Sequence, residues 1–381
     1  MPRFQWNIIH PEGKHRVVVT RELPGKRWLA VLAAADCRVE VYPGTEILDT
    51  DAIRAAIGDQ CDAVIGQLTE PWGAELFGAL KTAGGRAYSN YAVGYNNVDL
   101  EAATANGIPV GNTPGVLTET TAEMAVALTF AAARRTGESE RFLRAGRYKS
   151  WQPTLFLGEL LWRKTVGVIG AGRIGAAYAR MMVEGHKMNL LYHDVVDSTK
   201  LEEDVRAYGE YLASRGEPPV SCRRTPSVEE LLKEADCVSL HTVLDDTTRH
   251  LIDAERLAMM KKNAILVNTS RGPVIDEAAL VQHCRSHPEF KAGLDVFENE
   301  PSLSPGLETL ENVVIVPHIA SATRWTREGM AVLAAANVAA LLLNHPAWNR
   351  PDIAPFLQGE SPPAAPSILN ADALGLATYD G

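Results

Sequence analysis

The sequence predicts an α/β protein with two doubly wound parallel-sheet domains. Short apolar runs of strand character alternate with helical stretches, which is the pattern of parallel strands joined by crossover helices. This alternation occurs twice, once before residue 117 and again after residue 164. The chain has 381 residues, which is long for one ordinary domain and suits two.

The first series of elements occupies the amino-terminal part of the chain. A long helical segment follows it, from Thr118 to about Ala145, and its middle is small and apolar nearly all round. Such a composition predicts a helix that is buried between domains or between subunits. The strands expected before this helix are 17–20, 37–42, 62–66, 87–90 and 108–111, and the expected helices are 28–35, 51–57, 71–81 and 98–106.

The second series contains roughly six strands, which is the number in a complete dinucleotide-binding fold. Residues 198–224 interrupt it after the second strand, and we expect a surface insert there with a charged helix over 201–214. An Ala- and Leu-rich helix over 326–343 is expected to return the chain to the first domain. The six strands are 166–169, 190–193, 237–240, 265–268, 292–296 and 313–316.

Composition and charge restrict the classes of function. The formal net charge is −10 and the calculated pI is near 5.5, which argues against binding nucleic acid or an anionic membrane. No apolar stretch reaches the length of a membrane span without charges, and the amino terminus does not have the pattern of a signal or transit peptide. The five cysteines are scattered without metal-ligand spacing, so we expect reduced thiols in a soluble intracellular protein and no metal site.

A glycine-rich motif indicates a dinucleotide site. The apolar run 164–169 leads into Gly170-Ala-Gly172-Arg-Ile-Gly175, and a helical sequence follows directly. This strand–turn–helix context is what the dinucleotide fingerprint requires. Gly170 would make the tight turn, Gly172 would let the backbone approach the pyrophosphate, and Gly175 would allow the helix to pack closely on the strand. The alternative is a turn whose glycines serve packing alone.

An acidic residue follows the motif at the expected distance. The second strand of the series ends at Asp194, about twenty residues after the first glycine. A carboxylate at this position can accept hydrogen bonds from ribose hydroxyls and would repel a 2′-phosphate. The sequence therefore predicts NAD as the cofactor, with NADH preferred over NADPH.

Three polar residues follow three different strands of the second series. Arg271, Glu300 and His318 each come just past an apolar run. Because the carboxyl ends of parallel strands share one edge of a sheet, where ligands bind, we expect the three side chains to form one site. Taken singly, each could be an ordinary loop residue: a surface ion pair, a solvated charge, or an imidazole bonded to the backbone. Together they suit the binding of an acid and the transfer of a proton.

Several segments resemble the D-isomer-specific 2-hydroxyacid dehydrogenase family, and they span nearly the whole chain. Within that family the chain resembles most the plant-type, NADH-dependent hydroxypyruvate reductases, or glycerate dehydrogenases, of photorespiration, on residues 116–123, 180–185, 324–330 and the insert after Asp194. The matching segments are 89–99, 112–123, 170–175, 268–280 with Asn-Thr-Ser-Arg-Gly, 293–298 with Gly-Leu-Asp-Val-Phe-Glu, and 317–323 with Pro-His-Ile-Ala-Ser-Ala-Thr.

The resemblance implies a domain arrangement and an assembly. A Rossmann-like NAD-binding domain, 118–325, would be inserted into a flavodoxin-like substrate domain made of 1–117 and 326–381. The helix 118–145 would be the dimerisation arm of a homodimer. Plant relatives usually end in a peroxisomal tripeptide, whereas this chain ends in Thr-Tyr-Asp-Gly, so peroxisome, mitochondrion and cytoplasm all stay open.

The resemblance also assigns roles at the site. NADH would reduce the carbonyl of a small 2-keto acid, His318 would be the general acid, and Glu300 would orient its imidazole and stabilise its charged form. Arg271 would hold the substrate carboxylate. Further substrate-binding candidates are the backbone of Val93 and Gly94, and Trp325, which could equally be a packing residue. The cofactor candidates are Gly170, Gly172, Arg173, Ile174, Gly175, Asp194, Thr121, Thr242, Thr269, Ser270, Ser321 and Asp295, the last as a partner of the nicotinamide amide.

Other functions stay open at this point. Within the family the alternatives are D-3-phosphoglycerate dehydrogenase and other D-2-hydroxyacid dehydrogenases. Formate dehydrogenases of similar fold carry Gln in place of Glu300, so the carboxylate favours acid–base work. An NAD(H)-sensing scaffold similar to the transcriptional corepressors with this fold is the alternative of a different class. The acidic charge and the absence of long interaction tails count against it.

Overall fold

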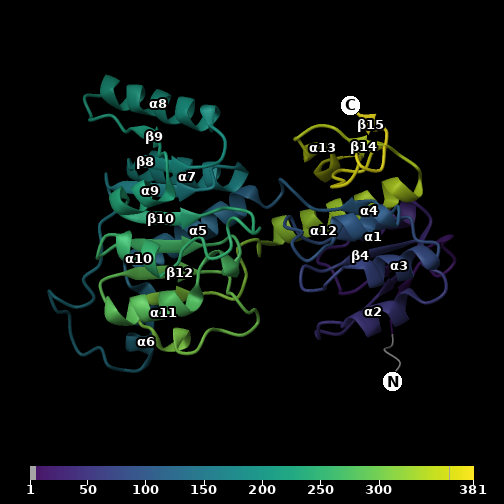
Figure 1. Ribbon diagram of the computed structural model, residues 1–381, viewed down its shortest axis with the longest axis horizontal. Helices are drawn as coiled ribbons and strands as arrows, with labels where there is room; N and C mark the ends of the chain where they lie inside the picture. The colour runs from purple at the N-terminus through teal and green to yellow at the C-terminus, as the bar shows by residue number, and fades with distance from the viewer. Residues whose placement is uncertain (1–5, 360) are drawn as a thin grey trace. The chain divides into compact units, whose positions relative to one another are not determined.

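The computed structural model describes residues 6–359 and 361–381, and the chain divides into two compact units (Figure 1). Unit 1 consists of the described residues up to Leu117 together with those from Ala322 onward, and unit 2 is Thr118–Ser321. The chain thus returns to unit 1 at Ala322 rather than at Thr326. The next helix begins two residues later, at Arg324, where the Thr323 side chain accepts the N–H of Thr326.

Unit 1 contains a six-stranded sheet in the order β1-β3-β2-β4-β5-β6. All neighbouring strands are parallel except β1 and β3. The antiparallel edge strand β1 was not predicted, because three residues are too few to show a period-two pattern. The strands are β1 (Asn7–Ile9), β2 (His15–Val19), β3 (Cys37–Val41), β4 (Ala63–Gly66), β5 (Ala87–Asn90) and β6 (Val110–Gly111).

The helices of unit 1 begin at recognisable caps. Asp49 and Asp99 each accept a backbone N–H of the first turn that follows them, at 2.8 Å. One helix expected from residue 71 begins only at Ala74, because Trp72 bonds through its backbone to Asn97 instead. The elements are α1 (Arg27–Ala34), α2 (Thr50–Ile57), α3 (Ala74–Thr82), α4 (Leu100–Ala105), α12 (Arg324–Leu342), α13 (Ala354–Leu357) and the small parallel pair β14 (Ala347–Trp348) and β15 (Thr378–Tyr379).

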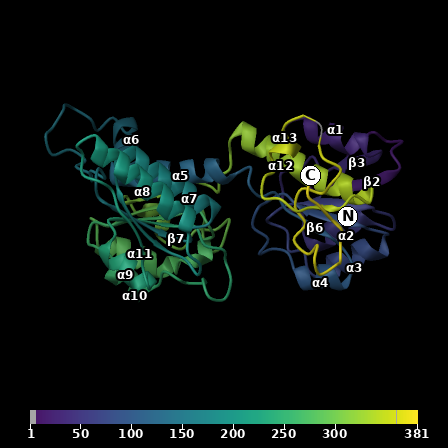
Figure 2. The ribbon, with the colours of Figure 1, turned by 90° about the horizontal axis from the view of Figure 1, so that it is seen from above.

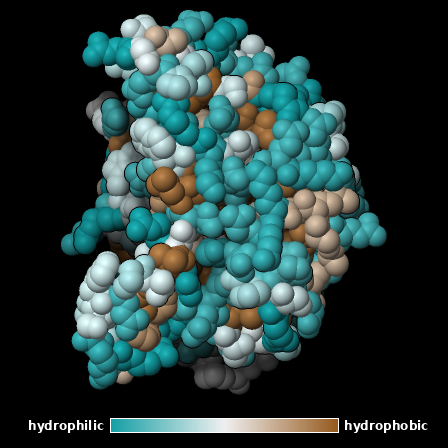
Figure 3. Space-filling view, turned by 90° about the vertical axis from the view of Figure 1, so that its left-hand side faces the viewer, coloured by the Kyte–Doolittle hydropathy of each residue, from teal (hydrophilic) through white to brown (hydrophobic). Residues whose placement is uncertain are grey.

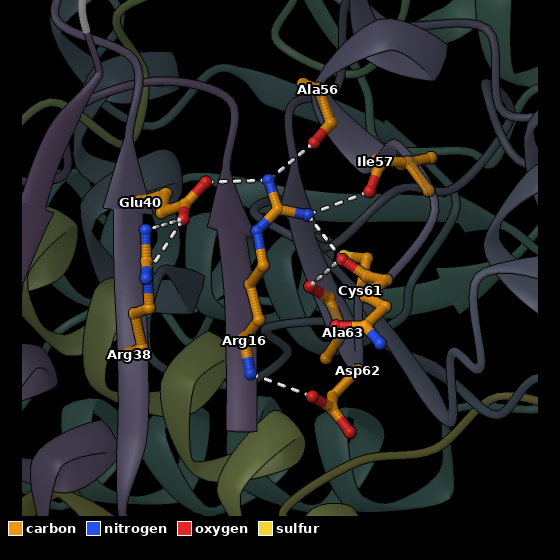
Figure 4. Close-up of polar contacts among 9 residues, drawn as sticks. Arg16, Arg38, Glu40, Ala56, Ile57, Cys61, Asp62 and Ala63 are labelled. Carbon is orange, nitrogen blue, oxygen red and sulfur yellow. Dashed lines mark hydrogen bonds and ion pairs between the residues drawn. The ribbon is translucent and has the colours of Figure 1, made fainter. Parts of the chain in front are cut away.

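A charged network joins two strands of unit 1 to helix α2 (Figure 4). Arg16 of β2 donates to Glu40 of β3 at 2.6 Å and to the backbone oxygens of Ala56 and Ile57, at the end of α2, at 2.8 Å. Arg38 donates to the second carboxylate oxygen of Glu40 at 2.9 Å. Burial alone would raise the pKa of Glu40, but the two arginines hold it below its usual value.

Unit 2 contains a seven-stranded, fully parallel sheet in the order β13-β12-β11-β10-β7-β8-β9. Six of its strands coincide with the expected ones. The seventh, β9, lies inside the segment predicted as a surface insert, so that prediction was wrong for residues 222–224. The strands are β7 (Thr165–Ile169), β8 (Asn189–His193), β9 (Cys222–Arg224), β10 (Cys237–Leu240), β11 (Ile265–Asn268), β12 (Lys291–Leu294) and β13 (Val313–Ile315).

Helices cover both faces of this sheet, as Figure 2 shows. One buried cluster joins the sheet to α5 (Thr118–Ala133), α7 (Arg173–His186) and α8 (Thr199–Ser214). The other joins it to α9 (Val228–Glu234), α10 (Ala254–Met259) and α11 (Glu277–Ser286). Alternate strand residues enter opposite clusters: Ile265 and Val267 pack into the first, and Leu266 packs into the second. A sheet buried on both faces explains why its strands are continuous apolar runs.

The arm expected as one helix over 118–145 is broken. Helix α5 ends at Ala133, and α6 (Thr136–Arg144) begins after Arg135, whose φ of 53° is left-handed. The backbone oxygen of Ala133 accepts the N–H of Glu159 at 2.9 Å, so the returning chain occupies an acceptor that a continuous helix would use. Sequence periodicity could not show this, because the competing donor lies on a distant segment.

The surface shown in Figure 3 is mostly hydrophilic, with small hydrophobic patches between polar side chains. Among the described helices none is long and apolar enough to cross a membrane. All five cysteines are free thiols, and Cys222 is the one that is only partly buried.

Candidate active site

The glycine-rich loop follows β7 with the geometry that its glycines require. Gly170 has a left-handed φ of 89°, and a Cβ there would lie 2.8 Å from the carbonyl carbon of His241. A Cβ on Gly175 would lie 2.0 Å from the backbone oxygen of Gly170. Both positions therefore exclude any larger residue, and α7 can pack tightly against the end of β7.

The amino terminus of α7 is open to a ligand. Gly172 precedes the helix without any side-chain cap, and a Cβ built on it would meet nothing within 4 Å. Arg173, in the first turn, is exposed, and Ile174 beside it is partly buried. Free N–H groups, a helix of fourteen residues and a nearby cation suit a pyrophosphate.

Asp194 lies at the end of β8, beside this loop. Its Oδ2 accepts the N–H of Ala171 at 2.7 Å, and its Oδ1 faces the N–H of Val196 at 3.3 Å. The carboxylate thus braces the glycine-rich loop, in addition to any bond that it would make to a ribose. Each carboxylate oxygen keeps a second acceptor position, so the two roles are compatible.

Two buried hydroxyls at the carboxyl edge of the sheet indicate a missing partner. Thr242 follows β10 and Thr269 follows β11, and neither Oγ1 has a hydrogen-bond partner among the described residues. Buried polar atoms are rarely left unpaired, so a polar ligand along this edge is the simplest explanation. With the open glycine loop, the residues present therefore fit a dinucleotide. Thr121 is buried in α5, and Ser321 is partly buried at the last position of unit 2.

Arg271 stands on a tight loop after β11. The Asn268 side chain holds that loop, because its amide donates to the Arg271 backbone oxygen at 2.8 Å and its oxygen accepts from Ser270 N–H at 3.0 Å and Oγ at 2.7 Å. The guanidinium donates to the Ser270 backbone oxygen at 2.8 Å. Burial lowers the pKa of Arg271, and the charge of Glu300 acts against this effect.

Glu300 and His318 form a direct pair. His318 Nδ1 lies 2.9 Å from Glu300 Oε2, while Glu300 Oε1 accepts the N–H of Phe297 at 3.0 Å. Burial tends to raise the pKa of Glu300, but the bond and charge of His318 and the charge of Arg271 lower it overall. The three predicted residues therefore interact electrostatically within unit 2, as their placement after three strands indicated.

Asp295 holds the turn that carries His318 in place through hydrogen bonds. The Asp295 side chain is fully buried and accepts the N–H groups of Ile319 at 2.6 Å and Ala320 at 2.9 Å. Its backbone oxygen accepts the N–H of His318 at 2.8 Å, and His318 has a left-handed φ of 51°. The sequence suggested a nicotinamide contact for Asp295; the structure shows that Asp295 holds the loop that carries His318.

A glycine lets the arginine loop and the glutamate loop meet. A Cβ on Gly272 would lie 1.9 Å from the carbonyl carbon of Phe297, so the two backbones are in contact there. No role was assigned to Gly272 or Asn268 from the sequence. The Asn-x-Ser spacing of residues 268–270 is a recognisable side-chain turn signal for the second of them. The contact at Gly272 has no sequence signal, because it depends on a loop from another strand.

The remaining substrate candidates belong to unit 1. The backbone oxygen of Val93 accepts from the Asn112 amide at 2.9 Å, and that of Gly94 accepts from the Asn90 amide at 3.1 Å. Both bonds fix the loop after β5 and leave the backbone N–H groups of Val93 and Gly94 for other partners. Trp325, in the first turn of α12, is 64% exposed, which differs from a residue packed in a core.

A cavity of about 700 Å³ lies in unit 2 but away from this site. Lys291, Asn312 and Glu159 are among its lining residues, and they lie near the amino ends of the strands rather than the carboxyl ends. None of the predicted site residues lines it. Among the described residues no cluster of three or more His, Cys, Asp or Glu could hold a metal ion.

Comparison with known proteins agrees with the geometry of the site. Glycerate dehydrogenase HPR, peroxisomal, of Arabidopsis thaliana is 60% identical, with 97% of each chain covered. A glyoxylate reductase of Korarchaeum cryptofilum is 41% identical over 92% of this chain and 95% of its own. Among solved structures, D-lactate dehydrogenase of Aquifex aeolicus complexed with NAD and lactic acid superposes with a TM-score of 0.68 at 26% identity, covering 83% of this chain and 92% of its own.

Residues 126–320 match the family described as D-isomer specific 2-hydroxyacid dehydrogenase, NAD binding domain. This range contains the glycine-rich loop, Asp194 and all three members of the Arg271, Glu300 and His318 site. The chain therefore belongs to the D-isomer specific 2-hydroxyacid dehydrogenases, a family of NAD-dependent oxidoreductases.

Proposed function

We propose that the protein reduces hydroxypyruvate to D-glycerate with NADH, and glyoxylate to glycolate. The observation that carries this proposal is the 2.9 Å pair of His318 Nδ1 and Glu300 Oε2, beside Arg271 at the same sheet edge as the glycine-rich loop. The names of the Arabidopsis and Korarchaeum relatives support these two substrates. Bound NADH would supply the hydride that the carbonyl carbon accepts.

The tautomer of His318 follows from its partner. An ionised carboxylate can only accept hydrogen bonds, so the proton shared with Glu300 sits on Nδ1. In the charged imidazolium the second proton is on Nε2, the atom free to act on a substrate. Nε2 would give this proton to the carbonyl oxygen as negative charge develops there, and the imidazole would be left neutral. The lowered pKa of Glu300 keeps its carboxylate ionised for this purpose at neutral pH.

Arg271 is the proposed anchor of the substrate carboxylate. A planar guanidinium offers two parallel N–H donors to a carboxylate, and the partly buried setting strengthens such bonds. The same cation would stabilise charge on the carbonyl oxygen during reduction. The backbone N–H groups of Val93 and Gly94 and the side chain of Trp325, all in unit 1, are proposed as further substrate-binding groups.

Three finer proposals accompany the reaction. Asp194 favours NADH over NADPH, because its carboxylate would repel a 2′-phosphate. The protein forms a homodimer, and we place the subunit contact in residues 143–162, at the end of the predicted arm 118–145 and beyond it, because Trp151, Leu157 and Leu160 there are between 66% and 78% exposed. The peroxisome is the favoured compartment, since the Arabidopsis relative is named peroxisomal.

A panel of four acids tests the proposed function. NADH oxidation is followed at saturating hydroxypyruvate, glyoxylate, pyruvate and 3-phosphohydroxypyruvate. We expect the highest kcat/KM with hydroxypyruvate and measurable turnover of glyoxylate. Dominant turnover of the phosphorylated acid would assign the protein to 3-phosphoglycerate oxidation instead. Only trace turnover of all four acids, together with NADH binding, would favour the NAD(H)-sensing scaffold.

A further inference from the structure

Arg224 lies next to Asp194, at a position where an NAD-specific site does not need an arginine. Arg224 is the last residue of the edge strand β9, and its guanidinium donates to the backbone oxygen of Asp194 at 2.7 Å. In dinucleotide-binding folds the adenine ribose lies at the end of the strand that Asp194 terminates, and an arginine nearby accommodates the 2′-phosphate of NADP. The chain therefore carries both the acid typical of NAD sites and a cation typical of NADP sites.

A carboxylate also engages this cation. Asp197 Oδ1 accepts from Arg224 at 2.5 Å, and the two side chains are 67% and 37% exposed. Arg224 thus bonds the backbone oxygen of Asp194 and the carboxylate of Asp197, and the two aspartates carry two negative charges against its single positive charge. Lys200, the lysine nearest to Asp197 in sequence, is itself paired with Asp204 at 2.5 Å. A 2′-phosphate placed here would meet two carboxylates and a cation that is already engaged.

We propose that Asp197 is a specificity-determining residue, which holds Arg224 in an ion pair and so prevents the NAD-type site from binding a 2′-phosphate. This inference rests on the proposed NADH preference and deepens it. Selectivity for NADH over NADPH then comes from two carboxylates. Asp194 repels the 2′-phosphate at the ribose, and Asp197 pairs with Arg224 so that this arginine cannot bind the phosphate. Specificity is a difference of two affinities, and a device that only penalises the wrong ligand is one way to obtain it.

The exposed ion pair sets the size of the expected effect. An exposed pair contributes modestly, and its charges are screened by salt, so the gain from releasing Arg224 is limited. For Asp197→Ala we expect the ratio of the NADPH to the NADH dissociation constant to fall about fivefold. The double variant Asp194→Ser with Asp197→Ala should lower the ratio further, because it removes both repelling charges. The gain should shrink as ionic strength rises.

The neighbouring arginine provides a matched control. Arg223 points to the other side of β9 and pairs with Glu230 and Glu234 of α9, the latter at 2.7 Å. In the Asp197→Ala background, Arg224→Met should abolish the gain in NADPH affinity, whereas Arg223→Met should preserve it. Glu203→Gln, an exposed charge on α8, controls for the loss of one negative charge and should leave the ratio unchanged.

Binding is measured without substrate, by titrating each full-length variant with NADPH and NADH and following cofactor fluorescence. Loss of hydroxypyruvate turnover would concern the proposed function and would leave this readout intact. An unchanged ratio in Asp197→Ala, or a gain that survives Arg224→Met, would overturn the role of Asp197. Wild-type protein that binds NADPH as tightly as NADH would also overturn it.

Discussion

Burial shifts the pKa values of Arg271 and Glu300 in opposite directions, and the contacts of Glu300 with its neighbours reverse the effect of burial on its pKa. It lowers the pKa of Arg271 and would raise that of Glu300, yet Glu300 is held ionised by His318 and Arg271. Glu300 therefore keeps the negative charge that it needs to accept the Nδ1 proton of His318. Removing His318 or Arg271 should raise the pKa of Glu300, besides removing the contact itself.

The first prediction concerns the shape of the cation at residue 271. Arg271→Lys keeps the charge but loses the planar pair of donors. We expect kcat/KM for hydroxypyruvate to fall about 10- to 100-fold, with NADH binding unchanged. Arg249→Lys, at an exposed position in the same unit, is the control. Near-normal kinetics of Arg271→Lys would mean that another group binds the carboxylate.

The positions of these residues were predictable, and the supports beneath them were not. Arg271, Glu300 and His318 each follow an apolar run, and parallel strands end at a common edge. From the sequence, Asp295 was predicted to contact the cofactor. Its bonds to the N–H groups of Ile319 and Ala320 could not be predicted, because no local sequence pattern marks them.

At the scale of secondary-structure elements, the segment after β8 is bonded to the glycine-rich loop. Ser198 Oγ donates to the backbone oxygen of Ala171 at 3.3 Å, and Asp194 accepts the N–H of the same residue. Tyr192 accepts the N–H of Ser198 at 3.1 Å and donates to Glu202 of α8 at 2.5 Å. The helix α8 thus helps to hold the glycine-rich loop.

This arrangement predicts a binding defect in Ser198→Ala. Losing one neutral hydrogen bond to the loop should weaken NADH binding about two- to tenfold, with a smaller effect on kcat. Ser214→Ala, at the far end of α8, removes a comparable bond to the Tyr211 backbone and should have no effect. Fluorescence titration with NADH measures both variants. Equal affinities would show that α8 does not position the loop.

Another element-scale prediction concerns the network of Figure 4. Arg16→Met leaves the nearly buried Glu40 with Arg38 alone and removes the bonds to the end of α2. We expect the free energy of unfolding to fall by about 2 kcal/mol at neutral pH. Arg54→Met, which breaks two exposed pairs, with Asp51 and Glu75, should cost less than about 1 kcal/mol.

The pH dependence of this loss has a definite sign. Because the pKa of Glu40 is lowered in the folded state, its stabilisation is present above the ordinary glutamate value of about 4.3. It disappears as pH falls through the lowered pKa of the folded state. Urea unfolding should therefore show a smaller difference between wild type and Arg16→Met at acid pH. A difference that grows in acid would contradict the assignment.

Element boundaries could be predicted only where the cause is local. The strands of unit 2 buried on both faces were evident as apolar runs. The three-residue edge strands β1 and β9 were missed, because their backbone partners rather than their own patterns make them strands. The break at Arg135 was missed because Glu159, far along the chain, takes the Ala133 acceptor.

At the scale of the whole molecule, the repeated alternation of strands and helices in the sequence predicts the two units. It does not predict how two chains would assemble. The segment 143–162 exposes large apolar side chains that a single chain leaves in water. We expect a dimer in wild-type protein, and a monomer when Trp151, Leu157 and Leu160 are replaced by Ser. Sedimentation equilibrium measures the mass of each.

The control for the dimer prediction uses exposed apolar residues of unit 1. Ile47→Ser and Leu343→Ser remove side chains that are 52% and 46% exposed, and they should leave the mass unchanged. A wild-type monomer, or a triple variant that stays dimeric, would show that the 143–162 segment is not the subunit contact.

The central claim is that His318, oriented by Glu300, gives a proton to the keto acid while NADH reduces it. Its most direct test is the pH dependence of single-turnover reduction of hydroxypyruvate, at saturating NADH, from about pH 6 to about pH 9. We predict that the rate falls as pH rises above neutrality, because the proton that the carbonyl oxygen must accept becomes less available, and that Glu300→Gln lowers the rate because the imidazole of His318 loses the carboxylate that orients it. A reduction rate that does not fall above neutrality, or that is unmoved by Glu300→Gln, would contradict the account.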